Sequence, residues 1–142
     1  MKQQLLTLSV VVLGTLASAQ AAADSDNSLA TGSLQSAFSS WGKPSVEGDW
    51  KIVEQDGTHY IELSENFRAK KGPDVKIFLS PTPAAQVTGT NAVNGSVLVK
   101  QIDDFDGQAR IALPAGTDLS QFQSLVFHCE AFSKLWGSSA LR

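Results

Sequence analysis

Sulfur is scarce in this sequence of 142 residues, which contains one cysteine, Cys129, and one methionine, the initiator. A single cysteine excludes an intramolecular disulfide, and the lack of a C-x-x-C-H sequence excludes a c-type haem attachment. A blue-copper site brings two histidines and one cysteine together, usually with a weak axial methionine. The two histidines are His59 and His128, and no methionine follows the initiator. The sequence therefore argues against copper of that type.

Motifs of the common catalytic classes are also missing. The chain has no G-x-S-x-G nucleophile elbow, no glycine-rich phosphate loop and no histidine in a recognisable nucleophile motif. Three acids precede Gly107, but the ligand series of an EF-hand does not follow them, and turn chemistry accounts for Asp103, Asp104 and Asp106. The sequence indicates no metal site and does not favour an enzyme.

Positive charge is in the minority. The chain has 11 Lys and Arg residues against 14 Asp and Glu residues, for a net charge of −3. A mildly acidic chain with scattered cations argues against a nucleic acid, and against an anionic membrane, as its partner. The charge does not indicate what the protein does bind.

The first 23 residues have the pattern of a secretory signal peptide. Lys2 provides a positive charge, an apolar run extends from Leu5 to Leu16, and small residues follow. The apolar run is shorter than the roughly 18 residues of a membrane-spanning helix, and no cysteine follows it closely enough to carry a lipid. We therefore expect cleavage after Ala23, no membrane insertion of the mature chain, and a periplasmic or secreted location.

The next segment, residues 24–40, is rich in Ser, Asp, Asn, Gly and Ala and is predicted to be a flexible leader to a β domain at 41–142. Apolar residues recur at helical spacing near its end, at Leu34, Phe38 and Trp41. This pattern favours either a short amphipathic helical turn or an irregular segment that docks on the domain.

Short β-prone segments separated by turn residues make up the rest of the chain. They are expected at 50–54, 58–63, 75–79, 96–102, 108–113 and 124–131. Asp56-Gly57 is a strong signal for a tight hairpin between the first two, and the segments 96–102 and 108–113 are predicted to form a second hairpin. Asp118 is expected to cap a single helical turn before the last strand.

These segments predict an all-β fold, an antiparallel β-sandwich or barrel of about seven strands with no core helix. The sequence has no internal repeat, and its predicted strands do not alternate with long helices. We expect the three tryptophans to pack in the core, because that is the commoner role of this side chain: Trp41, Trp50 and Trp136.

Cys129 is the first candidate for chemistry, because an unpaired thiol is unusual in an oxidising compartment. In an extended strand it shares one face with Leu125 and Phe127, while His128 points to the other face. The apolar company of Cys129 favours a packed core residue, since a free cysteine behaves there as a small hydrophobe. The same residue remains a redox candidate.

Two ordered series of motifs resemble the DM13 domain family. The first half of the resemblance lies in Tyr60-Ile61-Glu62-Leu63, Asn66-Phe67 and Gly72-Pro73-Asp74-Val75, leading into Ile77-Phe78-Leu79-Ser80. The second half lies in Phe105-Asp106-Gly107-Gln108, Leu113-Pro114, Asp118-Leu119, Val126-Phe127-His128-Cys129 and Phe132-Ser133-Lys134-Leu135-Trp136-Gly137. Each motif is weak by itself, but their order and spacing hold over about residues 41–141.

The resemblance implies an all-β extracytoplasmic module with one characteristic cysteine, here Cys129. It also implies redox or electron transfer, through a bare thiol or through a haem held non-covalently by Cys129 or His128. The family occurs beside DOMON domains in animal extracellular proteins and alone in exported bacterial proteins, and this chain has no DOMON segment. Asp74, in a structured turn, is a weaker candidate for ligand contact.

Two functional hypotheses follow. The first is an exported cell-envelope module that transfers electrons through Cys129, with an unidentified redox or envelope partner. The second is a non-catalytic binding or structural module of the envelope in which Cys129 is merely buried in the core. The sequence leaves open whether the protein is a monomer or a dimer linked through Cys129.

Overall fold

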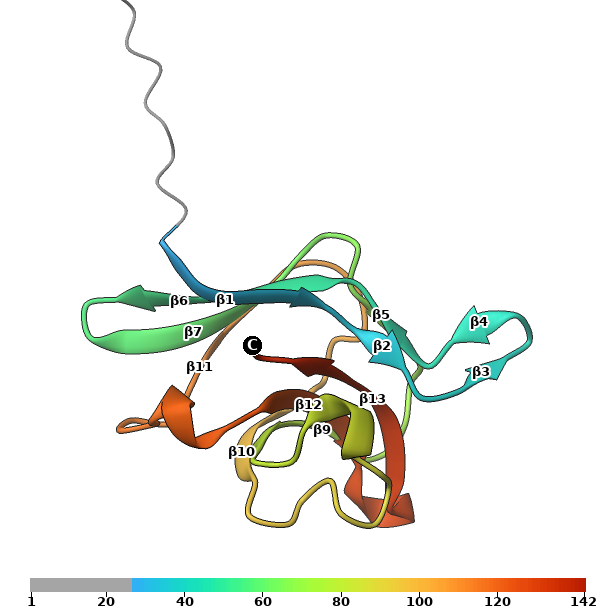
Figure 1. The fold of residues 1–142 in the computed structure, drawn as a ribbon. Coiled ribbons are helices and arrows are strands. Elements are labelled where there is room, and N and C mark those ends of the chain that lie inside the picture. Colours follow the sequence, from blue (N-terminus) through green and yellow to red (C-terminus); the bar gives the residue numbers. More distant parts are fainter. Residues whose placement is uncertain (1–26) are drawn as a thin grey trace, which may run out of the picture.

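The computed structural model describes residues 27–142 as two antiparallel sheets packed face to face (Figure 1). The predicted signal peptide lies outside the described residues. The four-stranded sheet has the order β1-β6-β7-β11, with bounds Ser28–Ser33, Asp49–Gln55, Thr58–Leu63 and Ala109–Ala112. The five-stranded sheet has the order β10-β9-β12-β13-β2, with bounds Val97–Gln101, Val75–Ser80, Ser124–Cys129, Lys134–Ala140 and Gln35–Ser36. The predicted all-β fold without a core helix is confirmed.

Two small ladders lie at one end of this sandwich. β3 (Ser39–Ser40) and β4 (Lys43–Pro44) form a short hairpin, and β5 (Val46–Glu47) pairs with β8 (Arg68–Ala69). In Figure 1 the β3–β4 hairpin extends beyond the body of the sandwich. Three short 3₁₀ turns complete the elements, η1 (Ala84–Gln86), η2 (Leu119–Gln121) and η3 (Glu130–Phe132). No helix within residues 27–142 is long and apolar enough to cross a bilayer.

The β6–β7 hairpin forms where the sequence predicts it. Asp56 and Gly57 at its turn have φ angles of 52° and 77°, the left-handed values that a two-residue type I′ turn needs. The predicted helical turn is also confirmed, because Asp118 accepts a hydrogen bond from the Ser120 amide (3.0 Å) at the start of η2.

The predicted second hairpin is wrong, although both of its strands exist. β10 pairs with β9 in one sheet, and β11 pairs with β7 in the other. The acidic segment between them therefore crosses from one sheet to the other. Local turn residues indicate where the chain bends, but the partner of each strand depends on the apolar faces that the two sheets bury against each other.

The segment predicted as a flexible leader differs from expectation where the structure describes it. Residues 28–33 form β1, which pairs with β6 and completes the first sheet. The helical turn is absent at 34–41, where the chain runs through β2 and β3. The docked alternative holds for Phe38, which packs against the core, and is wrong for Trp41, which is exposed. Leu34 is nevertheless buried in the core. Polar composition hid this strand, because β1 is an edge strand with only alternate residues partly covered.

One large core fills the space between the two sheets. It takes residues from both inner faces, among them Ile52 and Ile61 from one sheet and Ile77, Leu125 and Phe127 from the other. A smaller core lies on the outer side of the second sheet, where the loop between β9 and β10 covers it: Phe78, Val87, Ala92 and Val126. The central strand β12 is therefore buried on both faces, and all six of its residues are buried.

Asp49 ties the start of β6 to two other segments. Its carboxylate accepts hydrogen bonds from the Ser33 hydroxyl of β1 (2.5 Å) and from the Asn66 amide group (2.7 Å). The Ser33 hydrogen bond, followed by that from Asn66, lowers the pKa of Asp49 below its usual value. Both contacts stabilise the ionised form of the side chain.

This arrangement predicts an acid-sensitive contribution to stability. The contribution of Asp49 is complete above the ordinary aspartate pKa of about 4 and is lost as the pH falls through its lower folded-state pKa. Urea unfolding measured from pH 6 down to about pH 2 should therefore show a weaker pH dependence in Asp49→Asn than in the natural protein. Equal slopes for the two proteins across this range would contradict the prediction.

Candidate functional site

Cys129 is the last residue of β12, between β9 and β13. It has no exposed surface and belongs to the large core, together with Leu125 and Phe127 from the same strand face. Phe127 in turn packs on Phe67, with ring centroids 5.6 Å apart. The face predicted for Cys129 is thus the one it occupies. Its surroundings are those of a small packed hydrophobe.

The backbone leaves the core immediately after Cys129. Residues 130–134, here called the 130–134 turn, comprise η3, Ser133 and the first residue of β13, and all five are exposed. Phe132 in this turn has 65% of its surface exposed, an unusual position for a large apolar side chain. Ser133 adopts a left-handed φ of 47°, which reverses the chain into β13. A buried thiol therefore lies one residue from a solvent-facing turn.

Asp74 holds this turn against the end of β9. Its backbone carbonyl accepts the Glu130 amide (3.2 Å), and its carboxylate accepts the Ala131 amide (3.0 Å). Lys76 pairs with the Asp74 carboxylate at 3.0 Å and also donates to the Glu130 carboxylate. The hydrogen bond to Glu130, followed by that to Asp74, raises the pKa of Lys76. We call Asp74, Lys76 and Glu130 the turn clamp.

The loop between β9 and β10 holds the same turn from another side. An added Cβ on Gly89 would lie 2.2 Å from the Ser133 carbonyl oxygen, so only glycine permits this approach. The Gly89 carbonyl oxygen lies 2.8 Å from Nε2 of His128. Gly89 thus contacts the turn with its Cα and fixes the imidazole with its carbonyl.

His128 lies on the outer face of β12, opposite Cys129. Its ring is 2% exposed and meets Phe78 edge to face, with centroids 6.2 Å apart. Since a carbonyl oxygen can only accept, Nε2 is the donor in the contact with Gly89. Nδ1 is buried and has no hydrogen-bond partner among the described residues. The imidazole fastens the covering loop to β12 and does not approach the thiol.

A haem with Cys129 or His128 as axial ligand does not fit this arrangement. Each side chain is enclosed by packed residues on its own face of β12, so a macrocycle would have to replace core side chains. Four surface cavities of about 300 to 450 Å³ are lined by other residues. Across residues 27–142, no three His, Cys, Asp or Glu side chains gather in a way that could hold a metal ion. The thiol itself is the group available for chemistry.

Of the three predicted site residues, the fold brings Asp74 and Cys129 to the same end of β12 and β9 and turns His128 away. Asp74 binds the backbone of this chain, and its ligand contact stays a prediction. Sequence reasoning missed Lys76 and Glu130, whose opposite charges are 54 residues apart in sequence. A signal for Lys76 was available in the sequence, because it is the one charged residue in the otherwise apolar strand predicted at 75–79.

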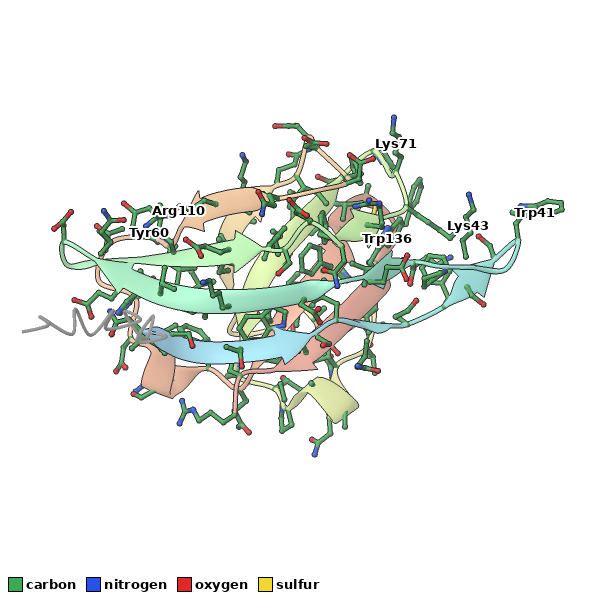
Figure 2. All side chains as sticks on the ribbon, turned by 90° about the horizontal axis from the view of Figure 1, so that it is seen from above. Trp41, Lys43, Tyr60, Lys71, Arg110 and Trp136 are labelled. Atoms are coloured by element: carbon green, nitrogen blue, oxygen red, sulfur yellow. The ribbon has the colours of Figure 1, made fainter. Side chains whose placement is uncertain are left out.

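Trp136 and Trp50 are buried, at 6% and 2% exposure, but Trp41 is 99% exposed, so the prediction of a core position for Trp41 is wrong. Trp136 packs against Phe38, with centroids 5.4 Å apart, and donates its indole N–H to the Lys70 carbonyl (2.8 Å). Trp41 lies at the tip of the β3–β4 hairpin, far from this packing (Figure 2).

The family model described as Electron transfer DM13 matches residues 37–141. This range includes β3 through β13, with Cys129 and the turn clamp, and begins after β1. No curated protein and no solved structure matches the chain.

The packing around Cys129 predicts unequal losses of stability for two small substitutions. Cys129→Ser buries a hydroxyl in an apolar setting and should cost about 1–3 kcal/mol of unfolding free energy. Cys129→Ala removes only the sulfur and should cost less, about 1 kcal/mol. Urea unfolding of both variants measures the difference. A serine variant as stable as the alanine variant would mean that the hydroxyl finds a partner or solvent.

Proposed function

Because this chain belongs to the family described as Electron transfer DM13, we propose that it is an exported electron-transfer module of the cell envelope with Cys129 as its redox group. The family match carries the proposal. The position of Cys129 supports it, since the one thiol of the chain lies directly beneath an exposed turn. The signal-like first 23 residues support export.

Thiol–disulfide exchange is the chemistry that one cysteine can perform without another group. The Cys129 thiolate attacks one sulfur of a partner disulfide and a new S–S bond forms. The partner's own S–S bond breaks, and its second sulfur leaves as a thiolate. Cys129 is oxidised and the departing partner sulfur is reduced. Because this chain has no other cysteine, net electron transfer uses the dithiol of a second, reducing partner. One of its thiolates attacks the Cys129 sulfur and displaces the first partner's remaining sulfur as a thiolate, so the first partner is fully reduced. The other thiolate of the reductant then closes the reductant's own disulfide and releases Cys129 as a thiolate.

This reaction requires the 130–134 turn to open, since Cys129 has no exposed surface in the closed structure. The turn is held mainly by the Asp74 contacts and by Gly89, and its own residues are all exposed. Segments with few buried contacts open locally at a free-energy cost well below that of global unfolding. The turn clamp would then control how often the thiol meets a partner. Phe132, exposed on the same turn, offers the partner an apolar contact.

A second candidate function is favoured by the complete burial of Cys129 within the large core. In this alternative the protein is a non-catalytic binding or structural module of the envelope, and the thiol only fills space. The two hypotheses differ in one measurable property. A redox thiol reacts through local opening, whereas a packing thiol reacts only when the whole domain unfolds.

The reaction of the folded protein with a small aromatic disulfide distinguishes the two hypotheses. If the turn opens locally, the rate at low urea should be independent of urea concentration, and mass spectrometry should find the adduct on Cys129. Asp74→Ala should raise this rate about tenfold, because a hydrogen bond to a charged acceptor contributes about 1.5 kcal/mol or more.

Asp118→Ala is the matched control. Asp118 also accepts hydrogen bonds from a 3₁₀ turn, but it caps η2 and not the 130–134 turn. Its three donors are the Ser120 amide (3.0 Å), the Ser120 hydroxyl (2.6 Å) and the Gln121 side-chain amide (3.3 Å). Its removal should leave the low-urea rate unchanged. A rate that follows global unfolding in all three proteins would contradict the redox proposal and favour the binding module. Any Cys129-linked dimer should likewise form faster in Asp74→Ala.

A further inference from the structure

Trp41 occupies the most exposed position of any large apolar side chain in the described part of the chain, at 99%. It is the first residue of the two-residue turn Trp41-Gly42 between β3 and β4. In Figure 2 its side chain points outward from the far end of the hairpin, away from both sheets. Burying a tryptophan side chain stabilises a protein more than burying most other side chains does. A fully exposed indole therefore needs a physical reason.

The backbone at this tip makes the choice of tryptophan more unusual. Trp41 has a φ of 55° and Gly42 a φ of 71°, the left-handed pair of a type I′ turn. Asn, Asp and Gly are the residues that adopt these angles readily, and a bulky side chain there is strained. Asn-Gly at positions 41 and 42 would make the turn more stable, so Trp41 lowers the local stability of the hairpin.

The base of the hairpin is firmly attached, which makes its tip a fixed projection. Ser45 is fully buried and its hydroxyl donates to the Trp136 carbonyl (2.5 Å). The Ser45 amide donates to the Phe38 carbonyl (2.8 Å). The Lys70 ammonium group donates to the Ser40 carbonyl, one residue before the tip, at 3.1 Å.

Cations gather around this projection. A groove of about 450 Å³ beside the hairpin is lined by Lys43, Arg68 and Lys70, with Glu47 as its one acid. Lys71 follows in sequence and is exposed on the same side (Figure 2). Lys134 lies at the hairpin base, with its ammonium 3.9 Å from the centre of the Phe38 ring.

Apart from Glu47 in the groove itself, an acidic segment lies behind the groove. β8 pairs with β5 on the side of the groove and bridges to Asp106 on its other side. The acidic segment that contains Asp106 is thus separated from the hairpin by a strand. The net charge of −3 argues against an anionic partner for the surface as a whole, but the end that projects the indole is locally positive. We call its four cations the collar: Lys43, Arg68, Lys70 and Lys71.

We propose that the β3–β4 hairpin docks this protein on the surface of an anionic phospholipid bilayer. Trp41 enters the interfacial layer, where its amphipathic ring is favoured, and the collar contacts lipid phosphates. An indole that is free on all sides suits insertion into a soft interface. A platform for stacking a sugar would need fixed polar groups beside the ring. The contact is peripheral and places no strand or helix within the bilayer.

The three tryptophans make the docking directly measurable. Trp50 and Trp136 are buried, so a blue shift of the emission on addition of vesicles reports Trp41. The exported, purified protein should show this shift with phosphatidylglycerol-containing vesicles and not with pure phosphatidylcholine vesicles. Added salt should reverse the shift, because the collar acts by charge.

Trp41→Asn separates docking from folding. Asparagine suits the left-handed turn, so the melting temperature should rise by about 4 °C, while co-sedimentation with anionic vesicles should be lost. The double variant Lys43→Gln, Lys71→Gln should bind about 30-fold more weakly, at about 1 kcal/mol for each lysine. Lys100→Gln, on the distant strand β10, is the control for loss of a lysine charge elsewhere on the surface and should bind as the natural protein does.

Three outcomes would overturn the proposal. The first is no sedimentation with anionic vesicles at low salt. The second is equal sedimentation of Trp41→Asn and the natural protein, which would assign any binding to another part of the chain, such as an uncleaved apolar N-terminus. The third is an emission shift caused by an acidic protein while vesicles cause none, which would make the hairpin a protein-docking site.

Discussion

The burial of β12 on both faces is the constraint on which the rest of the structure depends. Its inner face contributes Leu125, Phe127 and Cys129 to the large core, and its outer face contributes Val126 to the smaller one. A strand covered on both sides fixes the register of its neighbours, because a shift by one residue would exchange the two apolar sets. The loop from β9 to β10 is held in its folded form by its packing on the outer face of β12. There the His128 imidazole hydrogen-bonds the Gly89 carbonyl.

The same strand explains how a deeply buried thiol and a solvent-exposed turn come to be neighbours. β12 ends at Cys129, and Asp74 accepts the amides of the next two residues, which draws the turn against β9. The clamp therefore does two things at once. It closes the core over the thiol, and it concentrates the attachment of the turn in a few polar contacts, which are easier to break than the packing beneath them.

Much of the fold was predictable, because the signals for it are local. The Asp56-Gly57 turn, the alternation along 75–79 and the Asp118 cap all act within a few residues, and each has its expected conformation. The face of Cys129 also followed from alternation along one strand. The pairing of β10 and β11 with different sheets was not predictable, since turn chemistry says nothing about which distant strand becomes a neighbour. β1 was missed because a polar edge strand looks like a leader.

From the sequence alone, the all-β class, most strand positions and the single candidate thiol were determined, because residue types set backbone preferences over short distances. The tertiary structure decided which charges meet at the 130–134 turn and that Trp41 alone among the tryptophans faces solvent. It placed Cys129 in the large core and His128 beside Phe78 of the smaller one. It also placed a local cluster of cations in a chain of net negative charge. These features depend on segments that are far apart in the chain, and only the packing of the two sheets brings them together.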